Sequence, residues 1–178
     1  AFGGATLRAV AAPGHTYEHT AYLGLDERGQ SRAAFTGGAL LMGSAGRSDL
    51  LGPAHTAELT RLQWETAQRI RGLLSPAASL FPTHGAGSFC STTGSAMERS
   101  GSLATELTRN PALTSLTAEE FAAIQLATSA PIPGYYQYMA PLNRKGPRVY
   151  GEPPRPARLT PDEVASTTAN VIDIRPRL

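Results

Sequence analysis

Short apolar runs alternate with turn residues along the first forty positions, a pattern typical of an antiparallel meander. We expect strands at residues 5–12, 19–25 and 32–36. Because Pro13-Gly14 interrupts the first run, His15 is expected on a loop directly after a strand. Loops at strand ends commonly carry functional side chains, so this histidine is a candidate site residue.

A longer period follows in residues 53–74, where apolar side chains recur every three or four positions and predict one face of a helix. The residues on that predicted face are Leu59, Leu62, Ala67, Ile70, Leu73 and Leu74. A short buried strand is expected at residues 79–81. The turn after it carries a second candidate, His84.

A capping-box pattern at residues 117–120 predicts a second helix, with Phe121 and Ile124 facing inward. Residues 130–156 are rich in proline, glycine and tyrosine, which favours an irregular connection. After it, a second capping box at residues 160–163 predicts another helix start, and residues 170–175 are expected to form a strand. We therefore expect one domain over residues 1–152 and a linker with the start of a second unit over residues 153–178.

The composition excludes several classes of partner. Among 178 residues, 16 basic and 14 acidic side chains give a formal charge of +2, too small for the positive field that nucleic acid or acidic membranes require. No run approaches the roughly 20 apolar residues of a membrane span. The single cysteine, Cys90, excludes an internal disulfide and is consistent with a reducing, cytoplasmic location.

Four short segments, taken in their order along the chain, indicate a relationship to a known family. They are Pro13-Gly14-His15-Thr16, the Phe-Thr-Gly-Gly-Ala-Leu run at residues 35–40, the run from Gly43 to Leu50 that contains Gly-Arg-Ser-Asp-Leu, and the Pro-Thr-His-Gly-Ala-Gly-Ser run at residues 82–88. Together they resemble the second half of a metallo-β-lactamase-superfamily domain of the persulfide dioxygenase branch. The fold implied is α/β: the C-terminal half of an αβ/βα sandwich.

Further segments resemble bacterial fusions of that branch with rhodanese. They are Glu98-Arg99, residues 110–113, 133–136 and 143–147, and the run at residues 171–175, which is similar to the first rhodanese strand. A short, truncated rhodanese-like segment is therefore expected at the C-terminal end. In this interpretation Cys90 belongs to the first domain and is not the rhodanese nucleophile.

The resemblance implies a metal site. Dioxygenases of this branch hold one ferrous iron with two histidines and an aspartate, an arrangement suited to oxygen chemistry. His15 matches the second histidine, Gly38 occupies the aspartate position, and the motif that supplies the first histidine would lie before Ala1. His84 matches a ligand of the second metal in the dinuclear hydrolases. We therefore expect weak or no Fe(II) binding by this chain alone, and an inactive chain.

The activity implied is iron-dependent oxidation of glutathione persulfide, or another small thiol-derived substrate, to sulfite. Two alternatives stay open: a zinc-dependent hydrolase of a thioester or lactam, with His15 and His84 as Zn(II) ligands, and a degenerate binding module without metal. Tyr135, Tyr136 and Arg144, with Lys145 beside them, are candidates to approach the substrate carboxylates, since phenols and cations suit that task.

Several residues have a competing interpretation. Residues 15–19 spell His-x-x-Glu-His, an inverted zinc-protease signature that requires a helix, but the preceding Pro-Gly and the strand-like residues that follow argue against one. His19 and His55 are expected to be a packing residue beside the site and a surface residue at a helix start. Arg47 is a candidate substrate contact, but an internal ion pair with Asp49 is the favoured interpretation.

Half of a sandwich also leaves an apolar sheet face without its partner layer. Exposing a few hundred Å² of it costs several kcal/mol at ~25 cal/mol per Å². We therefore expect a homo-oligomer or a rearrangement that covers that face.

Overall fold

The computed structural model describes residues 3–84, 98–153 and 155–172 of the chain. These residues divide into two compact units, Ala1–Pro133 and Gly134–Leu178. The predicted boundary near residue 152 stays a prediction.

The described part of the first unit contains a five-stranded sheet with the strand order β1-β2-β3-β4-β5. Strands β1 (Thr6–Ala11), β2 (Thr20–Leu25) and β3 (Ser31–Gly37) are antiparallel neighbours, which confirms the predicted meander. Strand β4 (Ser79–Pro82) joins β3 in parallel, and the short β5 (Gly101–Ser102) completes the sheet. Buried and exposed residues alternate along β2 and β3, so one face of the sheet is covered and the other is open.

Helix α1 (Pro53–Leu73) connects β3 to β4, as predicted, and begins with proline at its first position. Its buried face is more polar than the periodicity indicated. Ile70 and Ala67 are buried, but Leu73 is exposed and Leu62 only half-buried, so the prediction that these two leucines lie on the buried face was wrong. The buried polar residues of the helix are Thr60, Gln63 and Thr66. The sequence period alone could not show that this face meets backbone groups as well as apolar side chains.

Three further helices follow the sheet: α2 (Leu103–Arg109), α3 (Pro111–Thr114) and α4 (Ala118–Thr128). Only α4 was predicted. The hydroxyl of Thr117 caps it by accepting the Glu120 N–H, and Phe121 is buried as expected. Ile124, expected to face inward, is instead 38% exposed, and Gln125 takes the inward position.

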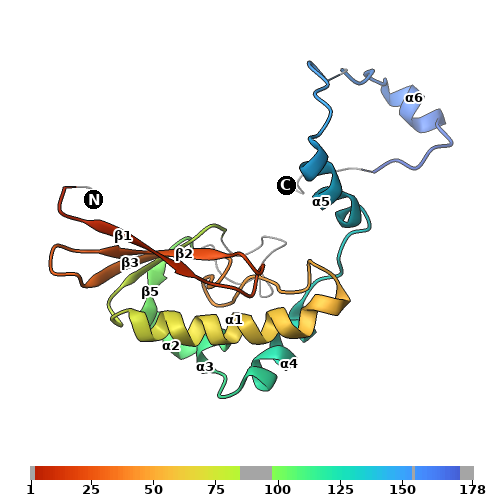
Figure 1. Ribbon diagram of the computed structural model, residues 1–178. Coiled ribbons are helices and arrows are strands. Elements are labelled where there is room, and N and C mark those ends of the chain that lie inside the picture. Colours follow the sequence, from red (N-terminus) through yellow and green to blue (C-terminus); the bar gives the residue numbers. More distant parts are fainter. Residues whose placement is uncertain (1–2, 85–97, 154, 173–178) are drawn as a thin grey trace. The chain divides into compact units, whose positions relative to one another are not determined.

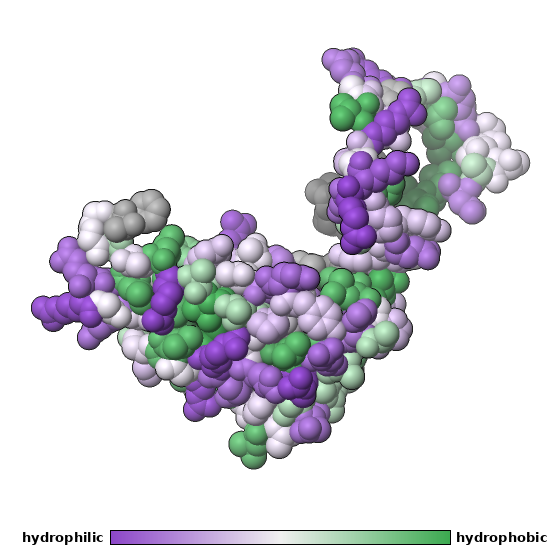
Figure 2. All heavy atoms as spheres, viewed as in Figure 1, coloured by the Kyte–Doolittle hydropathy of each residue, from purple (hydrophilic) through white to green (hydrophobic). Residues whose placement is uncertain are grey.

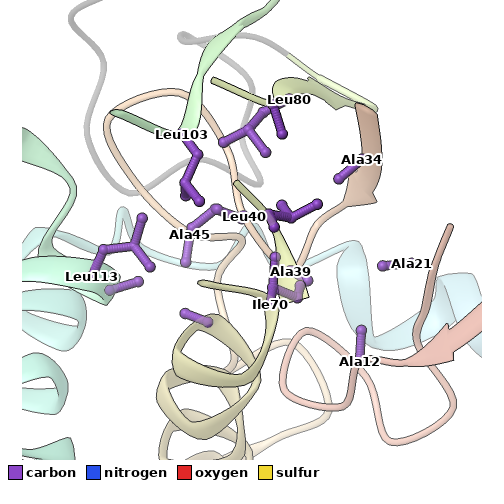
Figure 3. Packing of buried hydrophobic residues seen from close by; sticks show 14 of the residues in the cluster. Ala12, Ala21, Ala34, Ala39, Leu40, Ala45, Ile70, Leu80, Leu103 and Leu113 are labelled. Atoms are coloured by element: carbon purple, nitrogen blue, oxygen red, sulfur yellow. The ribbon is translucent and has the colours of Figure 1, made fainter. Parts of the chain in front are cut away.

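Helices α1 to α4 lie on one side of the sheet (Figure 1). The apolar core fills the space between them and the covered sheet face. Figure 3 shows that Ala39 and Leu40, from the chain after β3, lie close to Ile70 of α1 in that core. Because Leu40 is fully buried, the segment after β3 is part of the packing and not a free surface loop.

The second unit consists of short helices joined by extended chain. Helix α5 (Tyr136–Lys145) falls where an irregular connection was expected, so that expectation was wrong for these residues. Helix α6 (Pro161–Ser166) begins with the predicted capping box, since Thr160 and Glu163 accept each other's backbone N–H groups. Residues 170–172 of the predicted terminal strand are not in a strand, and residues 173–175 lie outside the described residues. In the described part of the chain, no helix has the length and apolar character of a membrane span.

Buried polar side chains tie down residues 37–49, which we call the glycine loop. Asn110, fully buried, donates from Nδ2 to the carbonyls of Leu41 and Ser44, at 3.0 and 2.9 Å. Glu106, also fully buried, accepts the Gly43 N–H at 2.6 Å. These bonds satisfy polar groups that would otherwise be buried without partners.

We expect Asn110→Ala to destabilise the first unit by about 2 kcal/mol, because it leaves the buried carbonyl of Leu41 without its described donor and removes one of two donors to the carbonyl of Ser44. Urea unfolding monitored by circular dichroism measures the change. The matched control is Asn143→Ala on the exposed surface of α5, which is expected to change stability by less than about 0.5 kcal/mol. Equal effects of the two substitutions would contradict the anchoring role of Asn110.

Candidate functional site

The candidate site lies at one edge of the sheet, where three strands end. Strands β1 and β3 are each antiparallel to β2, and β4 is parallel to β3, so β1, β3 and β4 all run in the same direction. Their carboxyl ends therefore meet at the same edge. The chain continues from these ends into His15, Gly38 and His84, respectively. Sheet topology thus brings together residues that are distant in the sequence.

His15 is half-buried and fixed by a backbone group. Its Nδ1 lies 2.7 Å from the carbonyl oxygen of Arg47. Since a carbonyl can only accept, Nδ1 must carry the proton, and Nε2 is left as the basic nitrogen of the neutral ring. The bond ties the loop after β1 to the glycine loop.

His19 is fixed through its other ring nitrogen, which accepts a hydrogen bond where His15 donates one. Its Nε2 accepts the N–H of Gly38 at 2.9 Å, so the lone pair of this nitrogen is already engaged. Its Nδ1 is buried, and no residue in the described part of the chain forms a hydrogen bond of normal geometry with it. Burial lowers the pKa of His19, and the nearby His15 lowers it further.

His84 lies against the same cluster. Its ring centroid is 6.3 Å from that of His15, while the His15 and His19 centroids are 6.1 Å apart. The Nε2 atom of His84 is buried and has no hydrogen-bond partner among the residues that the structure describes. Burial and the neighbouring His15 both lower the pKa of this imidazole. The predicted convergence of His15 and His84 is therefore present in the structure, although their role as ligands stays a prediction.

Residues 12–19 form turns and no helix. The inverted zinc-protease alternative needs His15 and His19 one helical turn apart, so that alternative was wrong. His55 lies exposed in the first turn of α1, as expected, where its Nδ1 is 3.1 Å from the hydroxyl of Tyr17.

Gly38 leaves room that His15 occupies. A Cβ added at Gly38 would lie 2.5 Å from Cδ2 and 2.8 Å from Cγ of His15, closer than real Cβ contacts allow. Gly37, with a φ of +57°, similarly lets His19 approach the backbone, since its Cβ would meet the ring Nε2 at 2.5 Å. The space that an aspartate side chain would need is thus filled by an imidazole, and turning that imidazole away would break its bond to Arg47.

These residues do not fit the iron site that the resemblance implies. Among the residues that the structure describes, no group of three or more His, Cys, Asp or Glu side chains could hold a metal ion. His15 and His84 offer two Nε2 atoms without a hydrogen-bonded carboxylate beside them, and iron prefers harder oxygen donors in addition to imidazoles. His15 and His84 together supply two imidazole nitrogens, which are only part of the ligand set that an iron site needs.

The remaining predicted residues have their own contacts. Arg47, 1% exposed, forms a bidentate ion pair with Asp49, with both N–O distances 2.7 Å, which confirms the favoured interpretation. Its Nη2 also donates to the carbonyl of Ala130, so the pair joins the glycine loop to the end of α4. This ion pair lowers the pKa of Asp49. Whether Arg47 has any further role toward a substrate is untested.

Tyr135, Tyr136 and Arg144 belong to the second unit, and their expected contact with a substrate stays a prediction. The two tyrosine rings are tilted against each other with centroids 5.7 Å apart, and Arg144 lies in the last turn of α5. The proposed Gly-Ala-Gly-Ser turn after His84 and Cys90 lie outside the described residues.

Two functional positions were missed at the sequence level. Gln63 of α1 donates from Nε2 to the carbonyls of Gly38 and Ala39, and Gln125 of α4 donates to the carbonyl of Gly46. Both amides are buried. The available signal was a glutamine within an apolar helix face, which indicates a buried hydrogen-bond partner but not which one.

The sequence matches no family model and no curated protein. Several solved structures share its fold, and two of them illustrate the similarity. One is a metallo-β-lactamase from Staphylococcus aureus subsp. aureus COL, with a TM-score of 0.70 and 23% identity over 85% of this chain and 43% of that chain. The other is ETHE1 from Myxococcus xanthus, with a TM-score of 0.59 and 25% identity over 81% of this chain and 55% of that chain.

The chain thus has a mixed α/β fold of the metallo-β-lactamase type, as predicted. It spans about half the length of the solved structures that it matches. The name of the first structure, a metallo-β-lactamase, indicates that proteins of its kind use a metal.

A double-mutant cycle tests the contact between Gly38 and His15. We expect Gly38→Ala to destabilise the chain by about 1 to 3 kcal/mol, because the added methyl group overpacks against the imidazole. In a His15→Ala background the same substitution is expected to cost much less, since the obstructing ring is gone. Chemical unfolding of the four proteins gives the coupling energy.

Gly72→Ala is the control for that cycle. It lies in α1 with nothing within 4 Å of the added Cβ, so it should be neutral or stabilising by up to about 1 kcal/mol. Additive effects of the Gly38 and His15 substitutions would show that the two residues are not in the described contact.

The lowered pKa values of His19 and His84 predict a loss of stability in mild acid. In the unfolded chain both rings have the ordinary histidine pKa of about 6.5, and in the folded chain their pKa values lie below it. As pH falls through and below about 6.5, the unfolded state binds protons that the folded state resists, so the free energy of unfolding decreases. It should be level between about pH 7 and 8.

Unfolding measured at intervals across this range gives the slope, and His19→Gln should reduce it. A slope between about pH 7 and 5 that is unchanged in His19→Gln would contradict the assigned burial of that ring.

Proposed function

We propose that this chain is the second half of a metallo-β-lactamase-type domain of sulfur metabolism, resembling glutathione persulfide dioxygenases, with an impaired iron site. Its substrate class would be glutathione persulfide or another small thiol-derived molecule, in the cytoplasm. A rhodanese-like segment after residue 152 belongs to the same proposal.

The observation that carries this proposal is the approach of His15 and His84. They come from loops after β1 and β4, and their ring centroids lie 6.3 Å apart. A satisfied structural histidine has partners for its ring nitrogens, whereas the buried Nε2 of His84 has none within the described ranges 3–84, 98–153 and 155–172. An open, buried nitrogen beside a second imidazole is consistent with a site inherited from a metal centre.

The impairment follows from Gly38. It has no carboxylate, and the ring of His15 lies over its Cα. No oxidation step is therefore assigned to these residues. What they can do is present two imidazole nitrogens at the end of the sheet, where the N–H and carbonyl of Gly38 are both engaged, by His19 and Gln63.

A second candidate function is a zinc-dependent hydrolase. The donor set favours it, because neutral imidazoles without a carboxylate suit zinc better than ferrous iron. The third possibility, a binding module without metal, is the outcome if neither ion is retained.

Metal uptake separates these candidates. The chain is purified, incubated with Fe(II) under nitrogen or with Zn(II), passed over a desalting column and analysed for metal content. The impaired iron site predicts a small fraction of an equivalent of iron, less than about one tenth, and the zinc-dependent hydrolase predicts zinc retention that depends on His15 and His84.

His15→Ala and His84→Ala should each abolish retained zinc, whereas the matched control, His55→Ala on the surface of α1, should not. Stoichiometric iron would show that the site is not impaired. Zinc retained equally by all three variants would show that neither His15 nor His84 is a zinc ligand.

A further inference from the structure

A buried amide side chain of helix α1, that of Gln63, touches both of the loops that carry His15 and Gly38. Figure 2 shows many hydrophilic residues over the helix side of the first unit, as is usual where helices face water. Gln63 differs from such residues because it is fully buried. A buried amide must find its partners inside the protein, so the groups around Gln63 indicate what it does.

The first of these loops is the glycine loop that follows β3. The Nε2 atom of Gln63 donates to the carbonyl of Gly38 at 3.1 Å and to the carbonyl of Ala39 at 2.6 Å. The Gly38 carbonyl also accepts the N–H of Gly46, at 2.9 Å, whereas Gln63 is the described donor to the Ala39 carbonyl. The side chain therefore fixes the main chain of residues 38 and 39 against α1.

The second loop follows β1 and packs on the backbone of the same residue. A Cβ added at Gly14 would lie 2.4 Å from Cα and 2.6 Å from N of Gln63, so no change of the Gln63 side chain could make room for it. Gly14 also has a φ of +142°, which L side chains rarely adopt. The hydroxyl of Thr66 donates to the carbonyl of Pro13 at 2.7 Å. The main chain directly before His15 is thus held on α1 at Gln63.

We propose that Gln63 is a positioning residue for His15, a role that rests on the proposed function of the His15–His84 pair. Gln63 sets the spacing between the main chain at Gly14 and the main chain at Gly38. His15 follows Gly14 in the chain, and its Cδ2 is 2.5 Å from where a Cβ of Gly38 would be. The imidazole therefore keeps its place over Gly38, 6.3 Å from the ring of His84, only while Gln63 holds both loops.

A merely structural role of Gln63 predicts a different result, and Gln68 of the same helix provides the comparison. Gln68 also donates from its amide to a main-chain carbonyl, that of Ala112 at 2.8 Å, but Ala112 belongs to α3 and to neither loop. Gln63→Met and Gln68→Met each replace the amide by an apolar chain of similar length. Both should lower stability, because a buried carbonyl loses its donor, but only Gln63→Met should move His15.

Proton NMR of the metal-free chain measures the position of the ring, because cross-relaxation between two protons falls steeply with their distance. In wild type, Hδ2 of His15 should give a strong cross peak to an Hα of Gly38, since the ring lies where a Gly38 side chain would begin. Gln63→Met should lose this cross peak, because residues 38 and 39 must shift to find another donor. Gln68→Met should keep it. Circular dichroism verifies that each variant is folded.

If Gln63→Met does not fold, Gln63→Asn takes its place, since it keeps the amide but is too short by one methylene to reach both carbonyls. The same loss of the cross peak is expected. A cross peak that persists in a folded Gln63 variant would overturn the proposal, as would its loss in Gln68→Met or its absence in wild type. Zinc retention is measured separately, so a chain that binds no metal would contradict the zinc-dependent function and leave this result unchanged.

Discussion

The architecture of the candidate site depends on one constraint: the glycine loop is buried, and its backbone groups must find partners inside the protein. Leu40 and Leu41 bring this loop into the apolar core. Burial without hydrogen bonds would cost roughly 1 to 3 kcal/mol for each unpaired group. Gln63 of α1, Glu106 of α2 and Gln125 of α4 provide those bonds, together with Asn110 at the junction of α2 and α3. The helices therefore position the loop, and the loop in turn positions the histidines.

The same constraint explains why the histidines have unequal roles. His15 donates to Arg47 and His19 accepts from Gly38, so each completes the hydrogen bonding of the loop with one ring nitrogen. Of the three histidines at the site, His15 and His84 have no described hydrogen bond at Nε2, and the missing side chain of Gly38 lets the ring of His15 pack on the backbone. Gly38, which the resemblance matches to a ligand position, thus supports packing in this chain.

The sequence predicted the parts of the fold that follow from periodicity. Strands β1 to β4, helix α1 and the capped starts of α4 and α6 all have a local cause in alternation, helical spacing or a capping pair. The convergence of His15 and His84 was also predicted, but from ordered motifs and not from local pattern. Helices α2 and α3 are short, and α5 contains Pro141, so their signals were weak or misleading.

What the sequence could not predict are contacts that join distant segments. The obstruction between His15 and Gly38, and the bonds from Gln63 and Gln125 to the loop, depend on how the layers pack. The inward turn of Gln125 in place of Ile124 has the same origin, because the carbonyl of Gly46 offers a buried acceptor there. Secondary-structure propensity and the spacing of apolar residues do not predict such a hydrogen-bond partner.

Nitrogen NMR of the metal-free chain, recorded above the pH at which ordinary histidines titrate, tests the central claim most directly, because long-range couplings identify the protonated nitrogen of each ring. The account predicts that His15 is fixed as the Nδ1–H form by Arg47, and that His19 is fixed with an unprotonated Nε2 by Gly38. Averaged tautomers like those of free imidazole, or a proton on Nε2 of either ring, would show that the histidines do not hold the loop.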